Sequence, residues 1–245
     1  EPDYNKNAEI NNKINKKYDE KDINKKNYFL IKNVKELDHW INEAEEQGEL
    51  AIDTETSSLD PHQTDLIGIS LSTKIGKACY IPIAHKNGHC LKKIDVIKKL
   101  KPIFEDKSIK KIGQNIKFDF IVLFKQGIEL SCMEDTMLMS YVLDAGKNRH
   151  NMDTLSTIHL NHNAISFKDL VGSGKKQINF SEVEIEKATE YAAEDADITF
   201  RLYKIFVENL KYEKLTYIYE TFEKPLIKIL SFMEISGVKI DTKFL

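Results

Sequence analysis

The first helix that the hydrophobic pattern predicts lies over residues 34–44, where apolar side chains recur at helical spacing. Asn33 and Glu36 stand three residues apart at its beginning, as in a capping box, and Gly48 is placed to end it. Further helical patterns lie over residues 94–104, 116–126, 134–143, 152–160 and 181–210. These spacings predict a chain rich in amphipathic helices, each with one apolar face to bury.

Strands are predicted where short apolar runs are bounded by turn residues. Such runs lie over residues 50–53, 66–71, 78–83 and 109–112. Gly76 lies between the second and third runs and fits a hairpin loop, so the first three runs predict an antiparallel meander.

The pattern changes toward the C-terminus. The longest predicted helix opens with a second capping box, Ser181 with Glu184. A long amphipathic stretch around Pro225 follows over residues 212–235, and residues 237–241 then resemble the start of a strand. A strand that begins without a partner predicts that the sequence is part of a larger protein.

Composition agrees with a folded globular chain. Of its 245 residues, 41% are hydrophobic and 31% are charged, and the net charge of -3 disfavours a basic protein that coats nucleic acid. A nucleic-acid enzyme is still allowed, because metal ions in an acidic site can bind phosphate. The three cysteines lack zinc-like spacing and indicate a reducing, cytoplasmic setting, and no apolar run is long enough to span a bilayer. Residues 1–27 are rich in Asn and Lys and predict a flexible lead-in without a signal-peptide core.

The candidate chemistry begins at Asp53 and Glu55, which follow the apolar run of the first predicted strand. Residues i and i+2 of a strand point to the same face, so the two carboxylates should lie side by side at the strand end. They repel each other, and burial adds a desolvation cost. Mg²⁺ or Mn²⁺, which prefer oxygen ligands, would remove both penalties. Alone, however, such a pair is more often a solvated strand end than a metal site.

Two further acidic sites follow along the chain. Asp119 falls in the first turn of a helix, where the helix dipole by itself would favour a carboxylate. Tyr191 and Asp195 are four residues apart on one helix face, among alanines small enough to let the helix approach a sheet closely. Glu194 and Asp197 belong to other faces, and the expectation for them is solvated surface or a structural hydrogen bond.

These acidic motifs, in their order along the chain, resemble those of a known family. The motifs are Asp-x-Glu over residues 53–55, Asn-x-Lys-Phe-Asp over residues 115–119 and Tyr-x-x-x-Asp over residues 191–195. They resemble the three exonuclease motifs of the DEDDy family, whose members have the DnaQ-like, RNase H-like fold. The likeness is closest to the proofreading domains of bacterial family A DNA polymerases, which residues 148–155 and 233–241 also resemble.

The resemblance implies an α/β fold with a mixed five-stranded sheet flanked by helices, followed by a helical C-terminal segment. Residues 28–210 would form the 3′–5′ exonuclease domain, residues 211–245 the truncated start of a polymerase thumb, and residues 1–27 a linker. The implied activity is hydrolysis of DNA from the 3′ end, one nucleoside monophosphate at a time, as proofreading in replication and repair. The implied setting is the bacterial cytoplasm near the nucleoid, as a monomer continuous with a polymerase domain. No polymerase activity is expected of this chain itself.

The resemblance also implies a site with two divalent metal ions, Mg²⁺ or Mn²⁺, with Zn²⁺ as a third candidate. Asp53 would bridge both ions. Glu55 and Asp195 would complete the shell of the first ion, and Asp119 would hold the second through water. Tyr191 would orient the attacking water with its hydroxyl, which is a poor base because its ordinary pKa is near 10.

The implied substrate is a single-stranded or frayed DNA 3′ end. Leu59 would wedge against the terminal base, and Phe167 would pack on the 3′ nucleotide in a contact that tolerates any base. The other implied contacts to the strand and its phosphates are Thr54, Gln114, Asn115 and Arg149. For Leu59 and Phe167 the simpler alternative is a place in the core, where most such side chains lie.

Three alternative functions are compatible with parts of the pattern. The first is a catalytically degenerate exonuclease fold that serves as a spacer, against which the complete acidic set argues. The second is an RNA 3′-processing exonuclease, against which the polymerase-like residues 237–241 argue. The third is a single-strand-binding module, which the net negative charge and the carboxylates disfavour.

Overall fold

The computed structural model describes residues 27–244, so the linker expected over residues 1–27 lies almost wholly outside them. The strands are β1 (Tyr28–Leu30), β2 (Glu49–Thr56), β3 (Leu66–Lys74), β4 (Lys77–Pro82), β5 (Lys110–Gly113) and β6 (Met133–Asp135). The helices are α2 (Val34–Gln47), α3 (Lys93–Glu105), α4 (Ile116–Phe124), α5 (Thr136–Asp144), α6 (Met152–Leu160), α7 (Phe167–Val171), α8 (Ile185–Tyr212), α9 (Thr216–Ile218) and α10 (Lys224–Ser236). Single turns of other helix types are η3 (Gly174–Lys176), η4 (Phe180–Glu182) and η5 (Tyr219–Glu223).

The described strands form one mixed sheet of six strands in the order β1-β4-β3-β2-β5-β6, so the expected number of five is wrong by one. β2, β3 and β4 form the predicted antiparallel meander, whereas β1, β5 and β6 pair in parallel with their neighbours. The edge strands β1 and β6 are each three residues long, too short to show a strand period in the sequence. β2 lies between β3 and β5, in the interior of the sheet.

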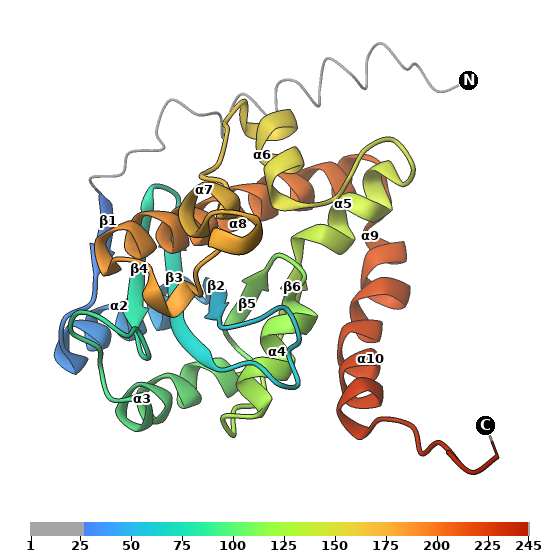
Figure 1. Cartoon of the computed structure of the whole chain (residues 1–245). Helices are drawn as coiled ribbons and strands as arrows, with labels where there is room; N and C mark the ends of the chain where they lie inside the picture. Colours follow the sequence, from blue (N-terminus) through green and yellow to red (C-terminus); the bar gives the residue numbers. More distant parts are fainter. Residues whose placement is uncertain (1–26, 245) are drawn as a thin grey trace.

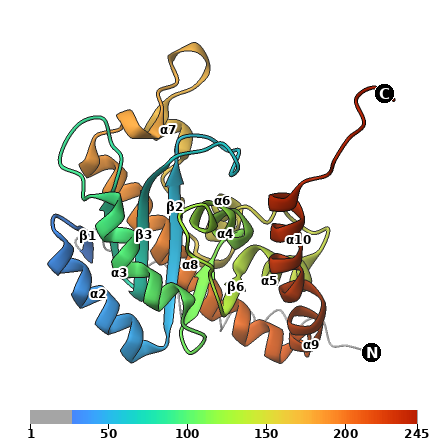
Figure 2. The same ribbon diagram turned by 90° about the horizontal axis from the view of Figure 1, so that it is seen from below.

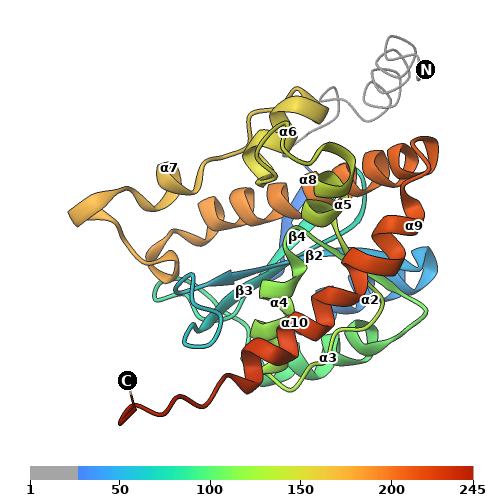
Figure 3. The ribbon, with the colours of Figure 1, turned by 90° about the vertical axis from the view of Figure 1, so that its right-hand side faces the viewer.

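Helices cover both faces of the sheet (Figures 1 and 3). The long helix α8 crosses one face, and its Ala193 and Ala196 are fully buried against Ala78 of β4, which confirms the predicted close approach. α5 and α6 lie beside α8 on that side, and α2, α3 and α4 cover the opposite face (Figure 3). Among the described residues no helix combines the length and apolarity needed to cross a membrane.

The beginnings of two elements test the capping predictions. Asn33 caps α2 as predicted, because its side chain accepts hydrogen bonds from two backbone N–H groups of the first turn. The capping box expected at Ser181 and Glu184 is wrong. Asn179 and Glu182 form that motif instead, in the short turn η4, and α8 begins after it. Both pairs have the same spacing, so spacing alone could not distinguish them.

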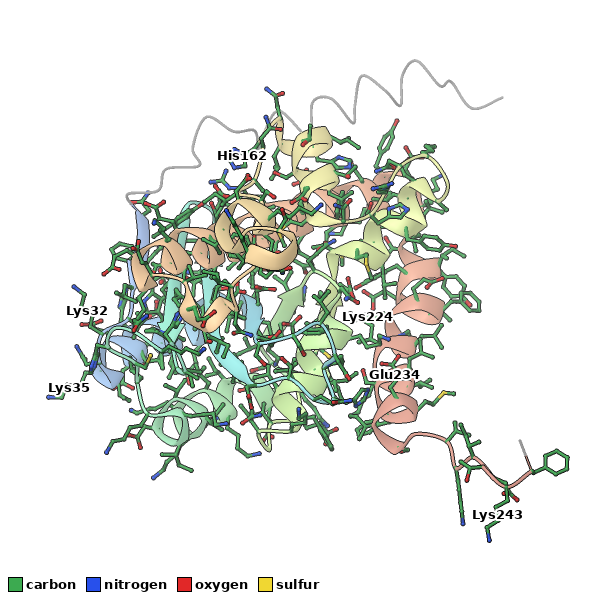
Figure 4. All side chains as sticks on the ribbon, in the orientation of Figure 1. Lys32, Lys35, His162, Lys224, Glu234 and Lys243 are labelled. Carbon is green, nitrogen blue, oxygen red and sulfur yellow. The ribbon has the colours of Figure 1, made fainter. Side chains whose placement is uncertain are left out.

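The C-terminal helices pack against the α/β part of the chain (Figure 2). Phe232 of α10 lies edge-on against two aromatic rings of α4. Lys224 and Glu234, labelled on α10 in Figure 4, pair with Glu134 of β6 and Lys117 of α4. The predicted amphipathic stretch is therefore helical, and its apolar and charged side chains fix it to the α/β part of the chain.

Residues 237–241 form no strand within the described chain, contrary to the prediction. Val238 and Ile240 alternate as a strand would require, but they are 87% and 61% exposed. A strand is stabilised by pairing with a neighbour, and no neighbour is present here among residues 27–244.

Gly68 of β3 lies directly against the ring of Tyr80, which leaves no room for a side chain. A Cβ at this position would lie 2.1 Å from the hydroxyl oxygen of Tyr80, which is fully buried. We expect Gly68→Ala to lower the free energy of unfolding by about 1–3 kcal/mol through overpacking, as measured by urea denaturation. In a Tyr80→Leu background the same substitution should cost much less, because the ring that it strikes is gone. An equal cost in both backgrounds would show that the ring is not the cause.

Candidate active site

Three elements of the fold meet at the acidic end of β2. The residues before this end, from Leu50 to Ile52, are completely buried, which anchors the strand in the core. Asp53 and Glu55 lie in the second half of β2, and the pairing with β3 shifts register directly after Glu55, as at a β-bulge. The first turn of α4 adds one carboxylate and the middle of α8 adds another with a tyrosine. The predicted catalytic residues, far apart in sequence, are therefore brought together here.

Three of the predicted ligands lie close enough to share a cation. Oxygen atoms of Asp53, Glu55 and Asp195 all lie within 4.8 Å of one another. Oε1 of Glu55 is buried and has no hydrogen-bond partner in the described part of the chain, which is costly for a polar atom. All the donors are carboxylate oxygens, which Mg²⁺ and Mn²⁺ prefer. These residues fit a divalent cation.

Asp119 lies beside this group and is held by Thr54. One of its carboxylate oxygens accepts hydrogen bonds from the backbone N–H and the hydroxyl of Thr54, at 2.9 and 2.6 Å. Asp119 is only 2% exposed, and its charge contributes to raising the pKa of Glu55. Thr54, expected from the resemblance to bind substrate, thus also fastens the first turn of α4 to β2.

The carboxylates resist ionisation because they lie close together, with Asp53 partly buried and the others buried. Burial raises the pKa of Asp53 to about 6. Burial, with added repulsion from Asp53, also raises the pKa of Glu55, Asp119 and Asp195 well above the usual range. A divalent cation would offset this repulsion, since an opposite charge favours the ionised form of a carboxylate.

Tyr191 lies beside this group. Its hydroxyl interacts with the carboxylate of Asp195. Burial, followed by the negative charges of Asp195, Glu55 and Asp53, raises the pKa of Tyr191 far above its ordinary value. The hydroxyl therefore stays protonated at neutral pH and can orient a neighbouring oxygen, but it cannot serve as the base.

A pocket of about 830 Å³ opens above the carboxylates. Its lining includes Asp53, Thr54, Glu55, Leu59, Phe118, Met152, Asp153, Phe167, Asn179, Phe180, Tyr191 and Asp195. Phe167 and Phe180 are stacked with an angle of 3° between their ring planes. The ring centroid of Tyr191 lies 6.1 Å from the ring centroid of each of them. Phe167 is 40% exposed and Leu59 is 91% exposed, so neither is a core residue. The carboxylates form the floor of this pocket, and the rings of Phe167, Phe180 and Tyr191 form an aromatic wall. The exposed side chain of Leu59 forms its apolar tip.

Three of the residues expected to contact substrate are not in this lining. Gln114 donates a hydrogen bond to the backbone carbonyl of His150. Asn115 has a left-handed backbone conformation, with φ of 60°, and its N–H donates to Asp135. Arg149 is exposed and also lies outside the pocket lining. In this structure Gln114 and Asn115 make hydrogen bonds within the protein around the start of α4.

Sequence reasoning missed part of the pocket wall. Phe180 and Asn179 come from the segment before α8, where no periodic pattern or spacing singled them out. Asn179 donates a hydrogen bond to the backbone carbonyl of Ser57, at 2.8 Å, which ties this segment to the chain that follows β2. Asp153 lies in a stretch that contributed to the family resemblance, and its charge adds to the raised pKa of Asp195. That stretch was therefore a usable signal.

Glu194 and Asp197 make structural hydrogen bonds, which was one of the two expectations for them. Glu194 is 1% exposed and accepts from the backbone N–H of Ile165 at 2.7 Å and from His162, labelled in Figure 4, at 3.2 Å. Asp197 is fully buried and accepts from the backbone N–H of Gly76 and the hydroxyl of Tyr28. The other expectation, solvated surface, is wrong for both.

The fold and the acidic site together define an RNase H-like nuclease. A family model described as 3′-5′ exonuclease matches residues 28–211, and the chain belongs to that family. The chain is 42% identical over 239 residues to DNA polymerase I of Rhizobium leguminosarum and 37% identical over 225 residues to DNA polymerase I of Pseudomonas aeruginosa, with 89% of this chain covered in each case. These alignments cover 23% and 25% of the two relatives, so the chain spans about a quarter of their length.

Solved structures show the same fold. NrnC of Brucella melitensis has a TM-score of 0.61 and 25% sequence identity, over 78% of this chain and 88% of that chain. A structure of the same protein with bound Mg²⁺ has a TM-score of 0.60, 26% identity, and covers 79% and 89% of the two chains. The POL domain of Pol1 from M. smegmatis, in complex with DNA primer-template and dNTP, has a TM-score of 0.70 at 17% identity, over 87% of this chain and 33% of that chain.

Glu55→Gln tests whether the buried charges destabilise the metal-free fold. Burial and the neighbouring carboxylates raise the pKa of Glu55 in the folded state, so its favourable contribution is present at low pH and is lost as the pH rises through that value. We expect metal-free E55Q to unfold about 3 °C or more above wild type at pH 7.5, with a smaller difference at pH 5, in thermal denaturation.

The same experiment with metal gives the complementary result. Mg²⁺ or Mn²⁺ should raise the unfolding temperature of wild type and should have little effect on E55Q. Glu190→Gln removes an exposed charge from α8 and is the matched control, for which we expect wild-type behaviour. Equal stabilisation of wild type and E55Q by metal would show that Glu55 is not a ligand.

Proposed function

We propose that this chain removes nucleoside monophosphates one at a time from DNA 3′ ends, as the proofreading exonuclease of a DNA polymerase I. The observation that carries this proposal is the cluster of carboxylates of Asp53, Glu55 and Asp195 at the floor of an aromatic-walled pocket. One buried oxygen of this cluster has no hydrogen-bond partner among residues 27–244. Family membership and the DNA polymerase I relatives support the reaction and the DNA substrate.

Asp53, Glu55 and Asp195 would hold one divalent cation, and Asp119 with Asp53 would hold a second. When bound, these ions would activate the water nucleophile and neutralise charge on the departing 3′ oxygen. The protein's own contribution is to fix the carboxylates on β2, α4 and α8 before substrate arrives. Mg²⁺ or Mn²⁺ is the proposed pair, and the Mg²⁺-bound structure of Brucella melitensis NrnC supports this choice.

Tyr191 would orient the attacking water through its protonated hydroxyl, which interacts with Asp195. The stacked ring of Phe167 would support the terminal nucleotide, because aromatic stacking tolerates any base. Leu59, at the apolar tip of the pocket, would separate that nucleotide from its neighbour or its pairing partner. These contacts favour a single-stranded or frayed 3′ end over an intact duplex.

The proposal extends to the organisation of the whole protein. Residues 28–210 would be the exonuclease domain and residues 211–245 the start of the polymerase domain, with residues 1–27 as a linker. We propose that the protein works as a monomer in the bacterial cytoplasm, where its DNA polymerase I relatives would act on DNA. Arg149, Gln114 and Asn115 would contact the strand outside the pocket.

A second candidate substrate is a short oligonucleotide or an RNA 3′ end. The supporting observation is a structure of Brucella melitensis NrnC bound to pGG, which has a TM-score of 0.60 and 25% identity, with 89% of that chain covered. A spacer without activity is a weaker alternative, because Asp53, Glu55 and Asp195 converge with Tyr191 at the pocket and Asp119 lies beside them.

A gel assay on single-stranded DNA labelled at the 5′ end tests the proposed reaction. With Mg²⁺ or Mn²⁺ we expect a ladder of products shortened by single nucleotides, and Asp53→Asn should reduce the rate by at least about 1,000-fold because it removes the shared ligand. An RNA oligonucleotide and a dinucleotide of matched sequence should be cut more slowly. Faster cleavage of either would select the second candidate, and no ladder from folded protein would favour the spacer.

Tyr191→Phe tests the orienting role of the hydroxyl. Removal of one hydrogen-bond donor from a formed site should lower kcat by about 10–1,000-fold with little change in KM. Tyr217→Phe removes a hydroxyl from a side chain that is 68% exposed on α9, and it should leave both constants unchanged. A rise in KM without a fall in kcat would assign Tyr191 to substrate binding instead.

A further inference from the structure

The loop over residues 57–65 presents Leu59 to the pocket, and several hydrogen bonds hold it in place. Its two ends are joined by hydrogen bonds from the N–H of Ser57 to the carbonyl of Asp65, at 3.0 Å, and from the N–H of Asp65 to the hydroxyl of Ser57, at 2.9 Å. The N–H of Ser58 donates to the hydroxyl of Thr64 at 2.8 Å. The neck of the loop is therefore closed by its own side chains.

Lys125 holds the tip of the same loop from outside. This residue directly follows α4, and its ammonium donates to the backbone carbonyls of Pro61, His62 and Thr64 at 3.3, 2.9 and 3.0 Å. An ammonium has three donors and no acceptor, so these three carbonyls use its full capacity. The loop is thus attached to α4, the helix that also carries Asp119.

The exposure of Leu59 shows why this attachment matters. Its side chain is 91% exposed, although the hydrophobic effect favours packing of an apolar side chain against any nearby apolar surface. A mobile loop would let Leu59 fold down onto the protein. A loop held at its neck and its tip keeps Leu59 pointed at the place where a terminal base would lie.

We propose that Lys125 is a positioning residue that keeps Leu59 in place as a rigid wedge, and that it thereby sets how efficiently a base-paired 3′ end is cut. This inference rests on the proposed exonuclease function. A single-stranded end needs no unpairing and therefore depends on the exact position of the wedge much less than a paired end does. A paired end must be opened before its last phosphodiester reaches the carboxylates, so its rate depends on where Leu59 is held.

The experiment compares the rate on a fully paired 3′ end with the rate on the same strand alone, for the full chain with Mg²⁺. We expect Lys125→Met to lower the paired-to-single ratio about three- to tenfold, with the single-strand rate within about twofold of wild type. Lys99→Met removes a lysine of α3 that is paired with Asp38, and this matched control should change neither rate. An equal fall on both substrates would overturn the proposal, because Lys125 would then contribute to binding or catalysis generally.

A double-mutant cycle with Leu59→Ala separates positioning from a direct contact with DNA. If Lys125 acts through Leu59, then Lys125→Met in the Leu59→Ala background should change the ratio by less than about twofold. Effects that multiply would show that Lys125 contacts the duplex independently, and the proposal would be wrong.

Hydrogen exchange without DNA distinguishes this inference from the proposed function. Lys125→Met should speed the exchange of the amides of Ser57, Ser58 and Asp65, which are bonded within the loop, and should leave the β2 amides protected. Absence of any nuclease activity in wild type would refute the proposed function, while unchanged exchange in Lys125→Met would refute the role of Lys125 in holding the loop.

Discussion

Repulsion among buried carboxylates is the constraint on which the rest of this structure depends. Asp53, Glu55 and Asp195 hold their oxygens within 4.8 Å of one another, and burial makes each negative charge more costly. A compliant chain would relieve this repulsion by moving the groups apart. Here the carboxylates stand on an interior strand and a long buried helix, so the free energy that holds them together comes from the hydrophobic core.

The substrate side of the pocket is built from loops, and these loops are also held in place by the more rigid parts of the fold. Loops can carry function only when a rigid scaffold positions them. Asn179 joins the aromatic wall to the chain after β2, Glu194 holds the backbone ahead of Phe167, and Lys125 holds the loop of Leu59. The loop of Leu59 is therefore attached to α4, which also carries Asp119, and the backbone before Phe167 is attached to α8.

Most of the fold could be predicted from the periodicity of apolar residues, and the errors of that prediction have a common cause. The longer helices and the antiparallel meander were predicted because each contains enough turns or alternations to show its period. The edge strands β1 and β6 are too short to show a period. The capping box was assigned to Ser181 and Glu184 instead of Asn179 and Glu182 because both pairs have the same spacing. Residues 237–241 have a strand-like alternation, but a strand also needs a partner that local sequence cannot supply.

The sequence by itself determined which residues could carry the chemistry. The spacing of Asp53 and Glu55 on a strand, and of Tyr191 and Asp195 on a helix, fixes each pair on one face through backbone geometry alone. Only the tertiary structure decided that the pairs meet, that Thr54 holds Asp119, and that Gln114 and Asn115 bond within the protein. The reason is physical: local geometry sets directions over a few residues, whereas packing of β2, α4 and α8 sets the distances between groups far apart along the chain.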